Sequence, residues 1–183
     1  QMSFDVEEKG IKYSYPDIEV QHLGYSSDKI IVEKLERNLL ILKEEYDQAP
    51  EDFMNVLSLA RTYLGLKDIE NSVKFTDKAI ELYETGNVIL SKENIFLAYM
   101  EKVTILGIGG EIYKAIELLE SKESDFGKLL MYKIACGELY FKTKQYLKSW
   151  KKLLVIKYGD LKLGLSPIDI KGLMRNANMF LLA

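Results

Sequence analysis

The sequence has few residues that could form disulfide bonds or bind a structural metal ion. Among its 183 residues are one cysteine, one histidine and three prolines. A single thiol, Cys136, excludes an internal disulfide, and one histidine with one cysteine cannot supply the ligand set of a usual zinc site. At this length about two thirds of the surface of the unfolded chain can be buried on folding. One domain with an apolar core is therefore expected, without cross-links.

An excess of positive charge is also absent. The chain has 25 Lys and Arg against 28 Asp and Glu, so its formal net charge is −3, and the two signs are interspersed. Proteins that bind nucleic-acid phosphates usually carry a basic surface, so nucleic acid is not an expected partner. No apolar run approaches the roughly 20 residues of a membrane-spanning helix. The acidic first residues do not form a secretion signal, and we expect a cytoplasmic protein.

Glycine and proline are sparse, and between them apolar residues recur at every third or fourth position, which is typical of helices. In residues 28–48 one helical face is apolar, with Ile31, Leu35, Leu39, Leu42 and Tyr46. The same pattern predicts further helices at 51–64, 69–83, 92–106, 111–121, 126–142, 146–158 and 167–182. The fold class is therefore expected to be all-α.

These helices are predicted to form hairpins that repeat along the chain. Small residues, which let two helices cross closely, occur at equivalent places as Ser72, Ala115 and Ser149. The last two are 34 residues apart, and the wider first spacing predicts a longer loop at 84–91. The strings Leu59-Ala60-x-x-Tyr63 and Cys136-Gly137-x-x-Tyr140 precede Ser72 and Ser149 at matching distances.

In spacing these hairpins resemble the tetratricopeptide repeat, whose length is 34 residues. Its fourth position usually holds a large aromatic residue and here holds Val56, Tyr99 and Lys133. The resemblance implies a right-handed stack of about three hairpins over residues 26–183, with residues 167–182 as a capping helix. A generic antiparallel helical bundle is the alternative. Residues 1–25 differ, because 11–15 and 18–22 alternate with period two and predict a short β remnant.

A second resemblance covers about residues 11–80. The string Ile18-Glu-Val-Gln-His22-Leu-Gly24-Tyr25 is followed by Lys34-x-x-Arg37-Asn38-Leu39-Leu40 and by Leu59-x-Arg61-x-Tyr63-Leu64. This combination resembles the junction where bacterial family 2 glycosyltransferases pass from their catalytic domain into a C-terminal helical-repeat region. The resemblance implies a parent enzyme that transfers a sugar from a nucleotide donor with the help of Mn²⁺ or Mg²⁺.

The chain has no Asp-x-Asp pair and no glycine-rich phosphate loop, so we expect the catalytic domain to be missing and no catalytic residue to be present here. By the same resemblance, His22 would be a metal ligand only together with that missing domain; the alternative is a histidine bonded to a backbone carbonyl. Arg37 and Asn38 are interpreted as domain-junction residues that orient the catalytic domain against the repeats. Ordinary solvated helix surface is the alternative for both.

A protein or peptide partner, which could be a second copy of this chain, is expected on the face formed by the first helix of each hairpin. The predicted partner-binding residues are Met54, Leu57, Arg61, Leu64, Met100, Met131, Ile134 and Phe141. Such an apolar groove needs a cover, since large apolar patches are rarely left exposed. A separate basic cluster (Lys142, Lys144, Lys148, Lys151, Lys152) would attract an acidic peptide or an anionic surface.

Two functions remain open at this point. The first is a non-catalytic binding or dimerisation module of a glycosyltransferase, which positions an acceptor or partner for the absent domain. The second is a free-standing adaptor that binds a peptide in its apolar groove. The reading frame upstream of Gln1 distinguishes them, because an Asp-x-Asp-bearing domain there favours the first and a start codon close to Met2 favours the second.

Overall fold

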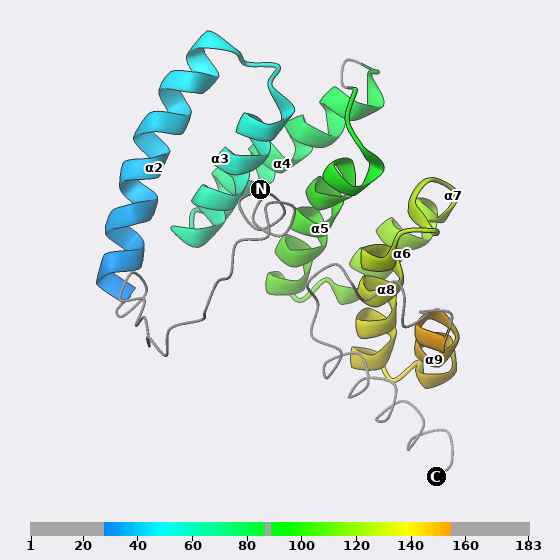
Figure 1. The fold of residues 1–183 in the computed structure, drawn as a ribbon. Helices are drawn as coiled ribbons and strands as arrows, with labels where there is room; N and C mark the ends of the chain where they lie inside the picture. The colour runs from blue at the N-terminus through cyan, green and yellow to red at the C-terminus, as the bar shows by residue number, and fades with distance from the viewer. Residues whose placement is uncertain (1–27, 87–88, 155–183) are drawn as a thin grey trace, which may run out of the picture. The chain divides into compact units, whose positions relative to one another are not determined.

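The computed structural model describes residues 28–86 and 89–154 (Figure 1). The chain divides into two units, residues 1–31 and 32–183. Of the first unit only the beginning of one helix is described, so the fold is that of the second unit. The strands expected at 11–15 and 18–22, the capping helix expected at 167–182, and His22 lie outside the described residues.

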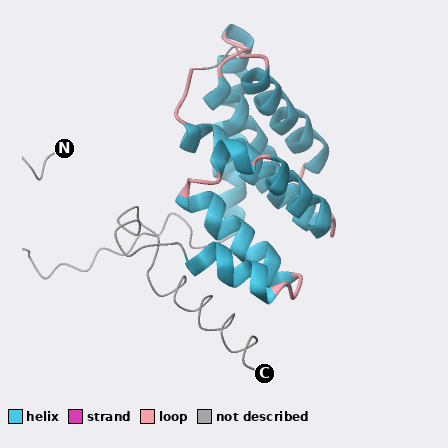
Figure 2. Ribbon diagram, turned by 90° about the vertical axis from the view of Figure 1, so that its right-hand side faces the viewer, coloured by secondary structure: helices cyan, strands magenta, loops and turns pink. Residues whose placement is uncertain are grey.

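All regular structure in the described ranges is helical, as Figure 2 shows. The helices are α2 (Asp28–Gln48), α3 (Phe53–Gly65), α4 (Ile69–Glu84), α5 (Lys92–Ile108), α6 (Ile112–Ser121), α7 (Glu123–Phe126), α8 (Leu130–Lys142) and α9 (Tyr146–Leu154). Sequential helices pack against each other as pairs, α3 with α4, α5 with α6 and α8 with α9, and each pair contacts the next. The all-α prediction is confirmed for this part of the chain.

The three hairpins turn in the same way. Each turn has one residue with left-handed backbone, at Lys67 (φ 63°), Gly110 (φ 75°) and Lys144 (φ 61°). The amide of the following residue donates to a carbonyl five residues earlier, with N···O distances of 2.9, 2.8 and 2.8 Å for Asp68, Glu111 and Gln145. These are the bonds of a Schellman C-cap. The turn residues are spaced like Ser72, Ala115 and Ser149, so the hairpin register read from the sequence agrees with the backbone.

The three small residues lie in the second helix of each hairpin, α4, α6 and α9. Ser72, Ala115 and Ser149 are all fully buried. The hydroxyl of Ser149 donates a hydrogen bond of 2.8 Å to the carbonyl oxygen of Gly137, on the facing helix α8. The predicted burial of the three small residues is confirmed.

Two apolar clusters form the core. One lies around α3 and α4, and Leu39, Leu42 and Tyr46 of α2 pack against it. The other lies around α5, α6 and α8 and includes the fully buried Phe126. Ile80 and Tyr83 of α4 contact both clusters, so the core is continuous along the hairpins.

One predicted helix is wrong. The sequence pattern predicts a single helix over 126–142, but Phe126 ends the short helix α7, and α8 begins only at Leu130. Between them Gly127 donates to the carbonyl oxygen of Glu123 at 2.8 Å. A Cβ atom at Gly127 would lie 2.5 Å from that oxygen, so the close approach requires glycine. The turn aims the Phe126 ring into the core.

Gly137 is a second glycine whose close contact can be tested by substitution. A Cβ atom at Gly137 would lie 2.6 Å from Cδ2 and 2.7 Å from Cγ of Leu153, which is itself fully buried. We expect Gly137→Ala to lower the free energy of unfolding by about 1–3 kcal/mol through overpacking, as measured by urea denaturation. Gly107→Ala is the control, because Gly107 lies in α5 with no atom within 4 Å of an added Cβ. That substitution should stabilise the helix by about 0.5–1 kcal/mol; equal effects at both sites would contradict the close crossing.

Candidate functional site

The predicted partner-binding residues are distributed unevenly between surface and core. Met54, Arg61 and Met131 are exposed, while Leu64, Met100, Ile134 and Phe141 are half-buried. Leu57 is a correction, because it is fully buried in the core cluster around α3 and α4. Side chains of α2 and α5 pack against that cluster, so position 57 has no surface left for a partner.

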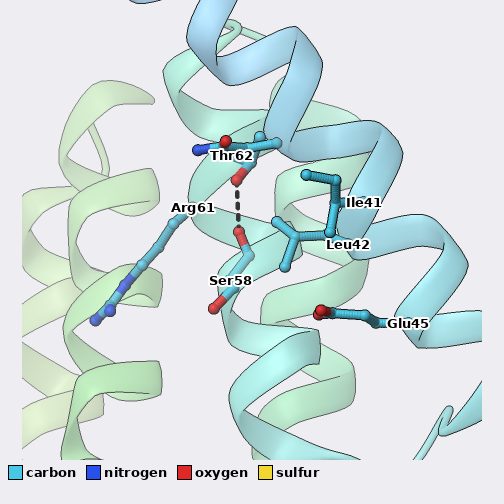
Figure 3. Close-up of a pocket in the computed structure, with 7 residues that line it drawn as sticks. Ile41, Leu42, Glu45, Ser58, Arg61 and Thr62 are labelled. Carbon is cyan, nitrogen blue, oxygen red and sulfur yellow. Dashed lines mark hydrogen bonds between the residues drawn. The ribbon is translucent and has the colours of Figure 1, made fainter. Parts of the chain in front are cut away.

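The structure places a pocket of about 390 Å³ between α2 and α3 (Figure 3). It is lined by Asn38, Ile41, Leu42, Glu45, Ser58, Arg61 and Thr62. The α2 residues recur at intervals of three and four, so they share one face of that helix. Asn38, predicted as a junction residue, and Arg61, predicted as a partner-binding residue, therefore belong to one site. Arg37 is exposed on α2 and does not line the pocket.

The pocket has an apolar side and a charged rim. Ile41 is 50% exposed, and in Figure 3 it lies beside Leu42 on α2, across from α3. On the α3 side, the hydroxyl of Thr62 donates to the carbonyl oxygen of Ser58 at 2.8 Å, and that of Ser58 donates to the carbonyl oxygen of Met54 at 2.7 Å. Both hydroxyl protons are thus used within α3, and the hydroxyl oxygens remain able to accept.

Arg61 connects this pocket to the next hairpin. Its Nε donates to Oε2 of Glu101 on α5 at 3.4 Å. The Glu101 side chain is only 11% exposed, whereas that of Arg61 is 43% exposed. Burial raises the pKa of Glu101, and the neighbouring guanidinium acts in the opposite direction. Among the described residues nothing bonds to the terminal amino groups of Arg61, so the guanidinium is anchored at one edge and can bind at the other.

Sequence reasoning missed most of this pocket. The apolar periodicity of residues 28–48 does not single out Ile41 and Glu45, because it assigns importance only to the face that packs on the core. The signal was nevertheless present, since the exposed apolar side chains of Leu40 and Ile41 lie outside that face. An exposed apolar pair on an amphipathic helix indicates a second contact surface.

Two features of the described ranges concern possible chemistry, the metal-ligating side chains and the thiol of Cys136. No cluster of three or more His, Cys, Asp or Glu side chains suited to a metal ion occurs in residues 28–86 and 89–154. The thiol of Cys136 is buried, and this burial raises its pKa to about 11, so it is protonated at neutral pH. Within the same ranges, no helix combines the length and the apolar character needed to cross a membrane.

Comparison with known proteins gives no assignment. None of the models of known protein families matches the chain, and a search of curated proteins finds no significant relative. A function must therefore be argued from the pocket and from the order of the helices.

Proposed function

We propose that this chain is a non-catalytic binding module, a right-handed stack of tetratricopeptide-like hairpins that holds a polypeptide segment of its partner. The three identical left-handed turns and the three buried small residues support the tetratricopeptide assignment. The observation that carries the function is the pocket between α2 and α3, which combines exposed apolar surface on α2 with Arg61, whose guanidinium extends from α3 away from Ile41 and Leu42 to pair with Glu101 of α5 (Figure 3).

The chemistry of the pocket defines the segment it would bind. The terminal amino groups of Arg61 can donate two parallel hydrogen bonds to a carboxylate, a geometry that lysine cannot reproduce. Ile41 and Leu42 offer an apolar contact in the same pocket. The partner segment is therefore a peptide with an acidic residue close to an apolar one, and Met54 and Met131 would extend the contact along the first helices of the hairpins.

If the resemblance to family 2 glycosyltransferases holds, this module would be part of a larger enzyme. In that setting the partner segment would belong to an acceptor or to a neighbouring protein, and sugar transfer, with Mn²⁺ or Mg²⁺, would occur in a catalytic domain outside this chain. Asn38 supports this version, because a junction residue that lines the binding pocket would couple the two parts. The free-standing adaptor remains the second candidate and would use the same pocket.

Peptide selection tests the proposal. Phage-displayed peptides selected on the chain should be enriched in sequences with an acidic residue near an apolar one. A synthetic selected peptide should bind Arg61→Gln about 10–100-fold more weakly in fluorescence anisotropy, since a hydrogen bond to a charged group contributes about 1.5–3 kcal/mol. Lys114→Gln removes the same charge from an exposed site on α6 and should bind like the wild type.

Two results would contradict the proposal. Equal peptide affinities of Arg61→Gln and the wild type would exclude the pocket as the binding site. Binding of UDP-glucose with Mn²⁺ by this chain in calorimetry would contradict its non-catalytic role, because a module without the catalytic domain has no expected donor site.

A further inference from the structure

A second pocket, of about 400 Å³, lies on the third hairpin and is independent of the pocket between α2 and α3. It is lined by Lys133 and Tyr140 of α8, by Lys148, Lys151 and Lys152 of α9, and by Glu123 of α7. Four lysines thus surround one small cavity in a chain whose net charge is −3. The volume is that of a small-molecule site.

Two of these lysines occupy positions that hold core residues in the other two hairpins. Counted from the left-handed turn residue of each hairpin, Lys133 corresponds to Val56 and Tyr99, which are both fully or almost fully buried. Lys152 corresponds in the same way to Phe75, which is buried, and to Leu118, which packs against the core. A lysine at a core position contributes less to folding than the apolar residue it replaces. Two lysines at core positions beside one cavity therefore indicate a role in ligand binding rather than in packing of the core.

The carboxylates nearby neutralise only part of this charge. Lys152 pairs with Glu123, and Nζ of Lys148 lies 3.3 Å from Oε1 of Glu120. The hydroxyl of Tyr140 donates to the same Glu120 oxygen at 2.7 Å, and this bond lowers the pKa of Glu120, so its carboxylate stays ionised at neutral pH. Lys148 and Lys152 are thus held in place.

The other two lysines have no such partner in the described part of the chain. Lys133 and Lys151 form no ion pair with another described residue. Two positive charges are therefore uncompensated at the pocket, which is also lined by the two lysines that pair with carboxylates. A dianion is the complementary ligand, and lysine ammonium groups are common phosphate ligands.

We propose that this pocket binds the phosphate group of a small phosphate monoester, with Lys133 and Lys151 as its principal ligands. Lys148 and Lys152 position the site through their pairs with Glu120 and Glu123 and add to its positive potential. The ligand is a small molecule, which a pocket of about 400 Å³ can hold, and the phosphate is its recognised group.

Calorimetric titration of the full chain with inorganic phosphate, at constant ionic strength, tests this site. We expect saturable binding that weakens at least tenfold in the double variant Lys133→Gln, Lys151→Gln. Lys114→Gln, which removes an exposed lysine of α6, should bind phosphate like the wild type. Glycerol phosphate should compete with inorganic phosphate, since the monoester carries the same recognised group.

The single variant Lys151→Gln keeps the test valid if the double variant fails to fold, because Lys151 is exposed. It should bind phosphate about threefold or more weakly and unfold at the wild-type temperature. Equal phosphate affinity of Lys151→Gln, Lys114→Gln and the wild type would overturn the proposal. So would the absence of saturable phosphate binding, or binding of a hexaglutamate peptide by a chain that does not bind phosphate, which would assign the cluster to an acidic polypeptide.

Discussion

Replacing Phe126 with alanine is expected to lower the free energy of unfolding by about 3–5 kcal/mol. Phe126 is fully buried, and its ring centroid lies 5.2 Å from that of Tyr99, 5.3 Å from that of Phe96 and 6.3 Å from that of Tyr83. The substitution would leave a cavity where α4, α5 and α7 meet. Domains are stable by only about 5–15 kcal/mol, so the midpoint of urea denaturation should fall markedly.

The control for this prediction is Tyr113→Ala. Tyr113 is an aromatic residue on α6 whose side chain is 65% exposed, so its truncation should change stability by less than about 0.5 kcal/mol. If Phe126→Ala and Tyr113→Ala had similar midpoints, Phe126 could not lie in the core, and the turn between α7 and α8 would have to be different.

The second large effect is expected at the crossing of α5 and α6. Ala115→Phe should lower the free energy of unfolding by about 1–3 kcal/mol or more, because Ala115 is fully buried and a ring has no space there. For a chain of this size, each kcal/mol corresponds to a shift of about 2–4 °C in the melting temperature. Differential scanning calorimetry measures that shift.

Ala49→Phe is the matched substitution for this experiment. Ala49 is exposed in the connection between α2 and α3, so the same ring can point into solvent. An unchanged melting temperature in Ala115→Phe, with Ala49→Phe as reference, would contradict the hairpin register on which the proposed repeat rests.

The helices were predictable because their signals are local. Asp52, Asp68 and Ser91 each accept a hydrogen bond from the backbone amide three residues later, as N-cap residues do. Ser72 and Ser149 also follow Ala60 and Gly137 at the same distance in the sequence, and Ala115 and Ser149 are 34 residues apart. The burial of a residue such as Ser72 can therefore be predicted from the sequence spacing alone.

The break between α7 and α8 and the pocket between α2 and α3 were not predictable in this way. The approach of Gly127 to the carbonyl of Glu123 depends on backbone geometry that periodicity does not encode. Likewise, Leu57 shares the spacing of exposed groove residues, but α2 and α5 bury its cluster. Both differences arise from contacts between helices, which a single helical pattern cannot specify.

The sequential packing of the hairpins has a consequence for how the protein unfolds. Because each helix pair contacts mainly its immediate neighbours, stability is close to a sum of pairwise interfaces, as in one-dimensional arrays. Such a chain can open one hairpin at a time, with the rest intact. An anion bound among α7, α8 and α9 would then hold that hairpin closed, because it would raise the free energy of detachment with the logarithm of its concentration relative to Kd.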